Sequence, residues 1–164
     1  MIVLGIDPGS SVTGYGIVKM ENIDNIHCLD FGCIYLTKIK DFNKRLKTIY
    51  DKVINLVESY HPDYLALEDI FYSQNIQSAL KLGQARGAAI IAALNTKVSL
   101  AVYSPREIKQ AITGYGGASK EQVQRMVVNL LNINQDILPL DASDALAAAI
   151  CHAGRLKTKR CTSE

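Results

Sequence analysis

Apolar residues follow two different periods along the chain, and the change between them separates strands from helices. Residues 2–6 form an apolar run that ends at Asp7 and is broken at once by a Pro-Gly pair, which predicts a buried strand followed by a tight turn. Residues 12–20 and 26–36 predict two further strands. Their short connections favour antiparallel neighbours.

From Phe42 to Tyr60 the apolar positions recur every three or four residues, with basic residues between them. This pattern predicts an amphipathic helix, which the His61-Pro62 pair ends. Residues 63–69 predict a fourth strand. Because a helical crossover leads to it, this strand is expected to lie parallel to one of the earlier strands.

The second half of the chain predicts further helices around one more strand. Residues 73–95 predict a long helix, and residues 98–103 predict a fifth strand. Ser104 and Ser119 each precede a helix with a capping box, since Glu or Gln follows three residues later. A last helix begins after Pro139. The order of elements predicts an α/β fold, with a five-stranded mixed sheet flanked by helices.

Length and composition fit one globular domain. A chain of 164 residues with 48% hydrophobic content can bury a continuous core. We place the domain at residues 1–153 and expect the basic segment at residues 154–164 to be a flexible tail, either solvated or in loose contact with a polyanionic partner.

Cysteine spacing and the beginning of the chain predict its location. The four cysteines form no Cys-x-x-Cys pair, which is typical of reduced thiols rather than of a zinc site. No basic leader precedes the first strand, and no apolar run approaches the about 20 residues of a membrane span. We therefore expect a cytoplasmic protein that does not associate with membranes.

Carboxylates stand at the ends of two predicted strands and at the start of the last helix. A buried carboxylate such as Asp7 is costly without a partner. Side chains alternate along a strand, so only one of Glu68 and Asp69 can share a site with Asp7; we choose Glu68, because Asp69 can be a solvated turn residue. Asp141 and Asp144 lie on one helix face, although acids in a first turn also cap a helix and favour its dipole.

Four convergent carboxylates repel one another unless hard cations neutralise them. Mg²⁺ or Mn²⁺ suits a set of oxygen ligands, and zinc does not. A pair of such ions clamps a phosphodiester and activates the attacking water. Without these four acids, 18 basic residues face 12 acidic ones, a surplus that is compatible with a polyanion as partner. His152 lies about 16 Å along the helix axis from Asp141 and is not expected to be a ligand.

A set of short motifs spans almost the whole chain. They lie at residues 5–10 (Gly-Ile-Asp-Pro-Gly-Ser), 14–16, 46–50, 62–64, 68 and 71, 78–87, 109–110, 120, 122–124 and 141–146. Together they closely resemble the RuvC family of crossover junction endodeoxyribonucleases over about residues 1–153. The resemblance implies a ribonuclease H-like fold and a homodimer that resolves Holliday junctions, four-way DNA junctions, by two symmetric nicks in recombination and repair. It also implies the branch-migration proteins RuvA and RuvB as partners.

The resemblance assigns roles to individual residues. It implies two Mg²⁺ ions per site, with Mn²⁺ able to substitute and Asp7 bridging the ions. The implied metal ligands and catalytic residues are Asp7, Glu68, Asp141 and Asp144. The implied DNA-binding residues are Phe71, which stacks on opened bases, Lys109 and Lys120, which lie near the scissile phosphate, and Lys81 and Arg86. Without the resemblance, lysines on helix surfaces would be interpreted as solvated.

Two residues depart from the family pattern, and one segment has two interpretations. Asp69 adds an acid where the family pattern has an uncharged residue, and Gln74 stands where a lysine can occur, so DNA contact near Phe71 is expected to be weaker. The small residues between 83 and 93 fit either close packing inside the monomer or a dimer surface.

Two other functions fit parts of the sequence. The turn at residues 5–11 with its following threonine also resembles the first phosphate loop of sugar kinases, Hsp70 and actin-like ATPases. Those proteins need a second comparable domain and do not need Asp141 and Asp144 together. The other alternative is a catalytically silent junction-binding module, against which the four intact carboxylates argue.

Overall fold

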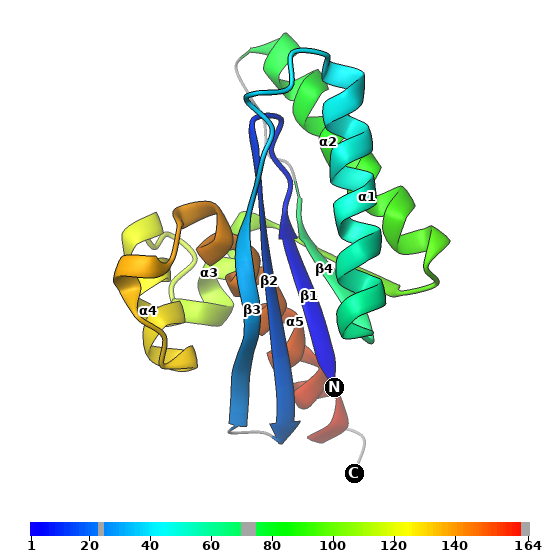
Figure 1. The fold of residues 1–164 in the computed structure, drawn as a ribbon. Coiled ribbons are helices and arrows are strands. Elements are labelled where there is room, and N and C mark those ends of the chain that lie inside the picture. The colour runs from blue at the N-terminus through cyan, green and yellow to red at the C-terminus, as the bar shows by residue number, and fades with distance from the viewer. Residues whose placement is uncertain (23–24, 70–74, 162–164) are drawn as a thin grey trace.

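A five-stranded mixed sheet forms the centre of the fold, confirming the predicted class (Figure 1). The computed structural model describes residues 1–22, 25–69 and 75–161, with side chains described up to residue 156. The strands lie in the order β3-β2-β1-β4-β5. Their bounds are β1 Ile2–Asp7, β2 Val12–Asn22, β3 Asn25–Tyr35, β4 Tyr64–Glu68 and β5 Ser99–Tyr103.

The directions of the strands follow from their connections. The short turns make β2 antiparallel to both β1 and β3, whereas the helical crossovers make β4 parallel to β1 and β5 parallel to β4. As a result, β1 and β4 lie side by side and their carboxyl ends share one edge of the sheet.

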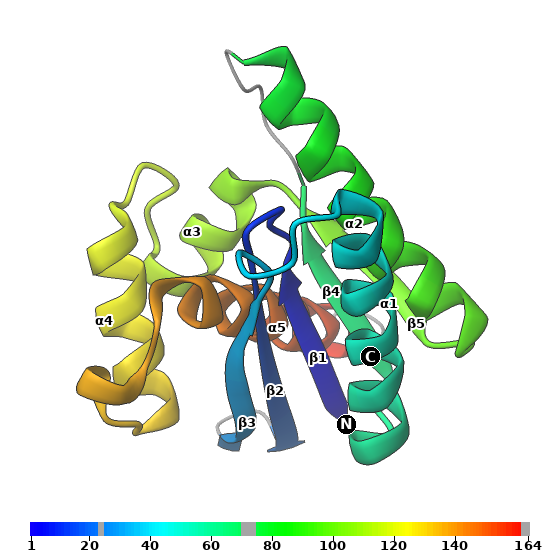
Figure 2. The ribbon, with the colours of Figure 1, turned by 45° about the horizontal axis from the view of Figure 1, so that its top comes forward.

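Helices cover both faces of the sheet (Figure 2). α1 and α2 pack with Leu4, Ile6 and Leu67 on one face, and α3, α4 and α5 pack with Val3 and Ala66 on the other. Their bounds are α1 Phe42–Tyr60, α2 Ile76–Asn95, α3 Pro105–Thr113, α4 Lys120–Leu131 and α5 Leu140–Cys161. Within the described part of the chain, none of these helices combines the length and apolar character needed to span a membrane.

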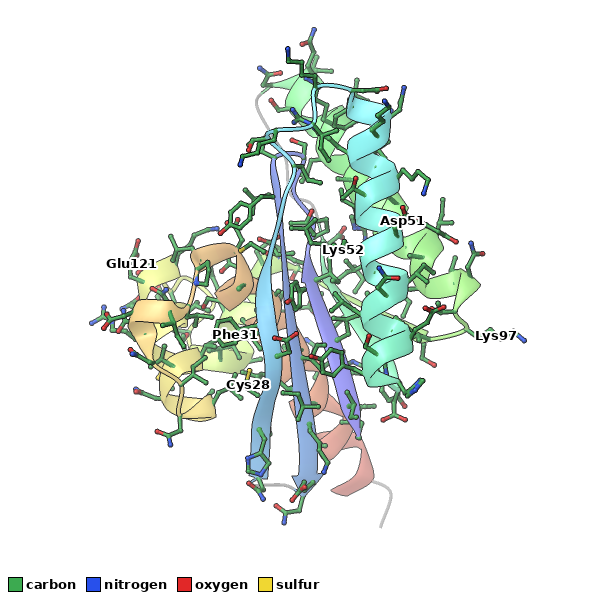
Figure 3. All side chains as sticks on the ribbon, in the orientation of Figure 1. Cys28, Phe31, Asp51, Lys52, Lys97 and Glu121 are labelled. Carbon is green, nitrogen blue, oxygen red and sulfur yellow. The ribbon has the colours of Figure 1, made fainter. Side chains whose placement is uncertain are left out.

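The helix starts follow the predicted capping signals. The side chains of Ser104 and Ser119 each accept a hydrogen bond from a backbone N–H in the first turn. In return, the side-chain oxygens of Glu107 and Gln122 accept from the backbone N–H of Ser104 and Ser119. The periodicity did not predict the short 3₁₀ helix at Gln135–Ile137. On β3, Phe31 and Cys28 point toward α4 (Figure 3), where they pack against the core cluster of that face.

α5 lies directly against the strand backbones because glycines leave room for it. A Cβ atom added at Gly5 would collide with the carbonyl oxygen of Ala145, and one added at Gly14 would collide with that of Asp141. Gly14 is also the residue paired with Asp7 across β1 and β2. This close approach brings the first turn of α5 next to the end of β1.

α5 extends beyond the predicted end of the domain. It continues without a break through Cys161, so the first part of the segment expected to be a flexible tail is helical. The sequence has no proline there to end the helix, and Arg155 anchors this part through an ion pair of 2.8 Å with Glu107. The division into a domain and a tail after Ala153 stays a prediction.

Candidate active site

Asp7 and Glu68 stand next to each other at one edge of the sheet. They directly follow Ile6 and Leu67, which are partners in the parallel pairing of β1 and β4. Side chains alternate along a strand, and Ala66, two residues before Glu68, packs in the core on the α5 face. Both carboxylates therefore belong to the face that α5 covers.

Asp141 and Asp144 come from the first turns of α5. The side chain of Asp144 is only 14% exposed, and its Oδ2 lies 2.7 Å from Nζ of Lys120. A narrow cavity of about 40 Å³ lies beside Asp144 and Lys120. It is lined by Glu68, Pro105, Ile108, Lys109, Lys120, Val123 and Asp144.

The protonation of these acids is strongly perturbed. Burial raises the pKa of Asp7 to about 8, and the negative charges of Glu68 and Asp144 add to the shift, while Lys120 opposes it. Burial also raises the pKa of Glu68, with Asp144 contributing in the same direction. Acids that influence one another in this way form one electrostatic unit, and such units are typical of functional sites.

The chemistry of the donors fits a hard cation. The converging side chains are carboxylates, and hard cations such as Mg²⁺ prefer oxygen ligands. Among the described residues, however, no three Asp, Glu, His or Cys side chains are arranged so that they could hold a metal ion. Like charges repel at short range, and Lys120 already neutralises Asp144. The carboxylates thus fit a cation by their chemistry, although no three of them have the arrangement of a metal site among the described residues.

The structure separates the expected DNA-binding residues into two groups. Lys109 and Lys120 line the cavity beside Glu68. Lys81 instead lies over the ring of Phe42, with its Nζ 5.9 Å from the ring centre. Phe71 and Gln74 lie outside the described residues.

Arg86 is paired within the protein. Its Nη2 lies 3.1 Å from Oδ1 of Asp69, and the backbone N–H of Asp69 donates to the carbonyl oxygen of Tyr103. Arg86 belongs to α2, on the face opposite α5. Asp69 is therefore directed away from the carboxylates that Glu68 joins.

Two residues that support the turn after Asp7 were missed by the sequence reasoning. The hydroxyl of the fully buried Thr13 donates to the carbonyl oxygen of Gly9 (2.9 Å) and accepts from its N–H (3.2 Å). Arg45 donates to the carbonyl oxygen of Ser10. A threonine inside an apolar strand is a usable signal, because buried hydroxyls need partners. Arg45 gave no such signal, since it lies among other basic residues.

His152 has a structural environment away from the carboxylates. Its Nδ1 lies 2.6 Å from the hydroxyl oxygen of Tyr103, and its ring lies 4.5 Å from that of Tyr64. The expectation that it is not a ligand of the acidic site agrees with this position.

Comparisons with known proteins agree over nearly the whole chain. The family model described as crossover junction endodeoxyribonuclease RuvC matches residues 3–152. The chain is 51% identical over 153 residues to the RuvC of Geotalea uraniireducens, covering 93% of this chain and 88% of that protein. It is 50% identical to the RuvC of Geobacter sulfurreducens, covering 93% of this chain and 92% of that protein.

Solved structures show the same similarity. Thermus thermophilus RuvC in complex with a Holliday junction substrate has a TM-score of 0.90 at 31% identity, covering 97% of this chain and 96% of that one. The yeast mitochondrial Holliday junction resolvase Ydc2 has a TM-score of 0.66 at 15% identity, covering 98% and 83% of the two chains. The second similarity shows the fold alone.

Proposed function

The chain belongs to the RuvC family of crossover junction endodeoxyribonucleases, and we propose from this that it resolves Holliday junctions by two symmetric nicks during recombination and repair. The observation that carries the proposal is the convergence of Asp7, Glu68 and Asp144 with two lysines at one edge of the sheet. A phosphodiester hydrolase needs this combination of acids and cations around the scissile phosphate.

The metal-binding residues of this site are Asp7, Glu68, Asp141 and Asp144. They would hold two Mg²⁺ ions, with Mn²⁺ as a substitute. When bound, such ions neutralise the phosphate, lower the pKa of the attacking water and stabilise the leaving oxygen. Burial is the main cause of the raised pKa of Asp7, and the negative charges of Glu68 and Asp144 add to it. Both effects support this assignment, because a bound cation is the partner that would relieve them.

Lys109 and Lys120, which line the same cavity as Glu68 and Asp144, act on the substrate. Both place positive charge near Glu68, and an ammonium group there attracts the phosphate backbone and stabilises charge that develops during cleavage. Asp144 keeps Lys120 in place through their ion pair.

Phe71, Lys81 and Arg86 would contact the DNA farther from the scissile phosphate. Phe71 would stack on opened bases, as the family resemblance implies. The exposed Lys81 remains available for phosphate contacts. Arg86 contributes less, because Asp69 already neutralises its charge.

A second copy of the chain fits the outer face of α2. Four large apolar side chains are more than half exposed there, and their successive spacings of 4, 11 and 3 residues place them on one stripe of the helix. They are Ile76, Leu80, Ile91 and Leu94. Gly83 and Gly87 lie in the same stripe, and within the described residues a Cβ added at either would meet open space. Two such stripes can pack closely about a two-fold axis, which would give the two symmetric sites that paired nicks require.

The remaining partners and the location follow from the family. We place RuvA and RuvB beside this protein as branch-migration partners. The free thiols of Cys28, Cys33 and Cys151 fit the cytoplasm, where DNA junctions form in bacteria.

Incubation with a labelled four-way junction tests the function. The purified protein is incubated with the junction or with a linear duplex of the same sequence, each with Mg²⁺ or with a chelator. Paired symmetric nicks in the junction alone, dependent on Mg²⁺, are expected. Equal cutting of both substrates would reduce the protein to a general nuclease. Binding without cutting would identify a silent junction-binding module, and ATP hydrolysis would favour the ATPase alternative.

A further inference from the structure

Arg45 joins two turns that are far apart in the sequence. Its Nη1 donates to the carbonyl oxygen of Ser10 at 3.1 Å, and its Nε donates to the carbonyl oxygen of Ile39 at 2.6 Å. Ser10 belongs to the turn that directly follows Asp7, and Ile39 belongs to the turn that leads into α1. A backbone hydrogen bond of 2.9 Å from Leu36 to Ser11 joins the same two turns.

The position of Asp7 depends on this turn more than that of other β1 residues. The pairing of β1 with β4 ends at Ile6, and Asp7 is the last residue that pairs with β2. Beyond Asp7, the turn is held by Thr13 at the start of β2, by the backbone bond from Leu36 to Ser11 and by Arg45 at Ser10. Loss of the Arg45 contact would remove the one side chain outside β1 and β2 that these bonds attach to the turn, and would loosen the backbone that follows Asp7.

An arginine suits this position because of its shape. The two acceptors come from different segments, and a guanidinium offers donors from several nitrogens in one rigid plane. A lysine carries the same charge but donates from a single nitrogen atom. The contact thus depends on the fork of the side chain as well as on its charge.

We propose that Arg45 is a positioning residue for the cleavage reaction: by bridging Ser10 and Ile39, it fixes the turn after Asp7 and so holds the Asp7 carboxylate in place. This inference rests on the proposed catalytic role of Asp7. Arg45 acts through the backbone and needs no contact with the scissile phosphate.

The test compares Arg45→Lys and Arg45→Ala with Lys47→Ala as a matched control. Lys47 lies on the same helix, is exposed, and forms an ion pair with Asp51. Three quantities are measured: the single-turnover cleavage rate at saturating junction, the junction Kd, and the hydrogen exchange rate of the Leu36 amide. Arg45→Lys keeps the charge, so its Kd is expected to stay within about two-fold of the wild-type value.

Both Arg45 variants are expected to lower the cleavage rate about 10- to 100-fold, since a displacement of about 1 Å in a reacting group has an effect of this size. Exchange of the Leu36 amide is expected to accelerate about 10-fold, while Lys47→Ala changes neither quantity. If Arg45→Ala fails to fold, the cleavage rate and the Leu36 exchange rate of Arg45→Lys still test the inference.

Two results would overturn the inference. A normal cleavage rate in Arg45→Lys, with weaker junction binding in Arg45→Ala alone, would make Arg45 a phosphate contact. Unchanged exchange at Leu36 would show that the bridge does not hold the turn. Failure of the proposed function is distinguishable, because the wild-type protein itself would then leave the junction uncut while the exchange measurement still reports on the bridge.

Discussion

The ammonium nitrogen of Lys120 lies 2.7 Å from Oδ2 of Asp144, so that a lysine from the start of α4 neutralises a carboxylate of α5. The same ammonium group lowers the pKa values of Asp7 and Glu68 against the effect of burial. The positive charge of Lys120 thus stabilises the ionised form of three acids that come from three elements of the fold. Lys120 therefore affects the protonation of all three acids, and under the proposed function we expect it to affect the substrate as well.

Replacement of Lys120 is expected to slow cleavage and weaken the salt dependence of junction binding. In Lys120→Ala the phosphate loses one cation, so the slope of log Kd against log salt concentration should fall by about one. Cleavage rates and Kd values at several salt concentrations check this. Lys52→Gln serves as the control, since Lys52 is an exposed cation on α1 (Figure 3); an equal effect of both variants would contradict a specific role.

Replacement of single carboxylates is expected to abolish cleavage and leave binding intact. Removing a negative charge does not weaken attraction to a polyanion, whereas each acid is proposed to hold a metal ion. The variants are Asp7→Asn, Glu68→Gln, Asp141→Asn and Asp144→Asn. The control is Asp69→Asn, which should keep most of its activity because Asp69 pairs with Arg86. Loss of junction binding in all four variants would indicate a structural role instead.

The stability of the metal-free protein is expected to decrease between about pH 4 and pH 8. The pKa of Asp7 rises from 3.8 to about 8 in the folded state, so the folded state holds more protons than the unfolded state throughout this interval. Asp7→Asn removes the cost of ionising this buried carboxyl group, so it should raise Tm at pH 8 by about 3 °C or more. Thermal melts with a chelator present check this. A lower Tm for Asp7→Asn at pH 8 would contradict the electrostatic account.

A charge on the outer face of α2 is expected to separate the proposed dimer. Leu80 is 63% exposed, so Leu80→Glu should leave the fold intact while it places two like charges in the interface. Sedimentation analysis should then show monomers, and cleavage should produce single nicks. Ile137→Glu is the control, because Ile137 is similarly exposed at 61% but lies outside α2. A dimer that survives Leu80→Glu would exclude this face.

Most elements of the fold could be predicted because their signals are local. The bounds of α1 were predicted correctly from its period and from the His61-Pro62 stop, and the starts of α3 and α4 from their capping boxes. The choice of Glu68 over Asp69 agrees with their placement here, because alternation along a strand is also local. The metal and DNA roles of these residues remain predictions.

Contacts between distant segments could not be predicted in this way. Lys120 and Asp144 are 24 residues apart, and Arg45 and Ser10 are 35 apart. The hydrophobic pattern of a sequence does not indicate which of many similar basic side chains contacts a given acceptor. The helical continuation of α5 past residue 153 was missed for a related reason, since its anchor is the distant Glu107.

The glycine at position 14 extends the active site to a residue that has no functional group. Its hydrogen occupies the place where any side chain would strike the carbonyl oxygen of Asp141. Gly14→Ala would push the first turn of α5 away from Asp7 and enlarge the spacing of the acids, although every acid would still be present. A genetic screen for inactive variants should therefore recover this glycine together with the carboxylates, and a search for chemical groups alone would overlook it.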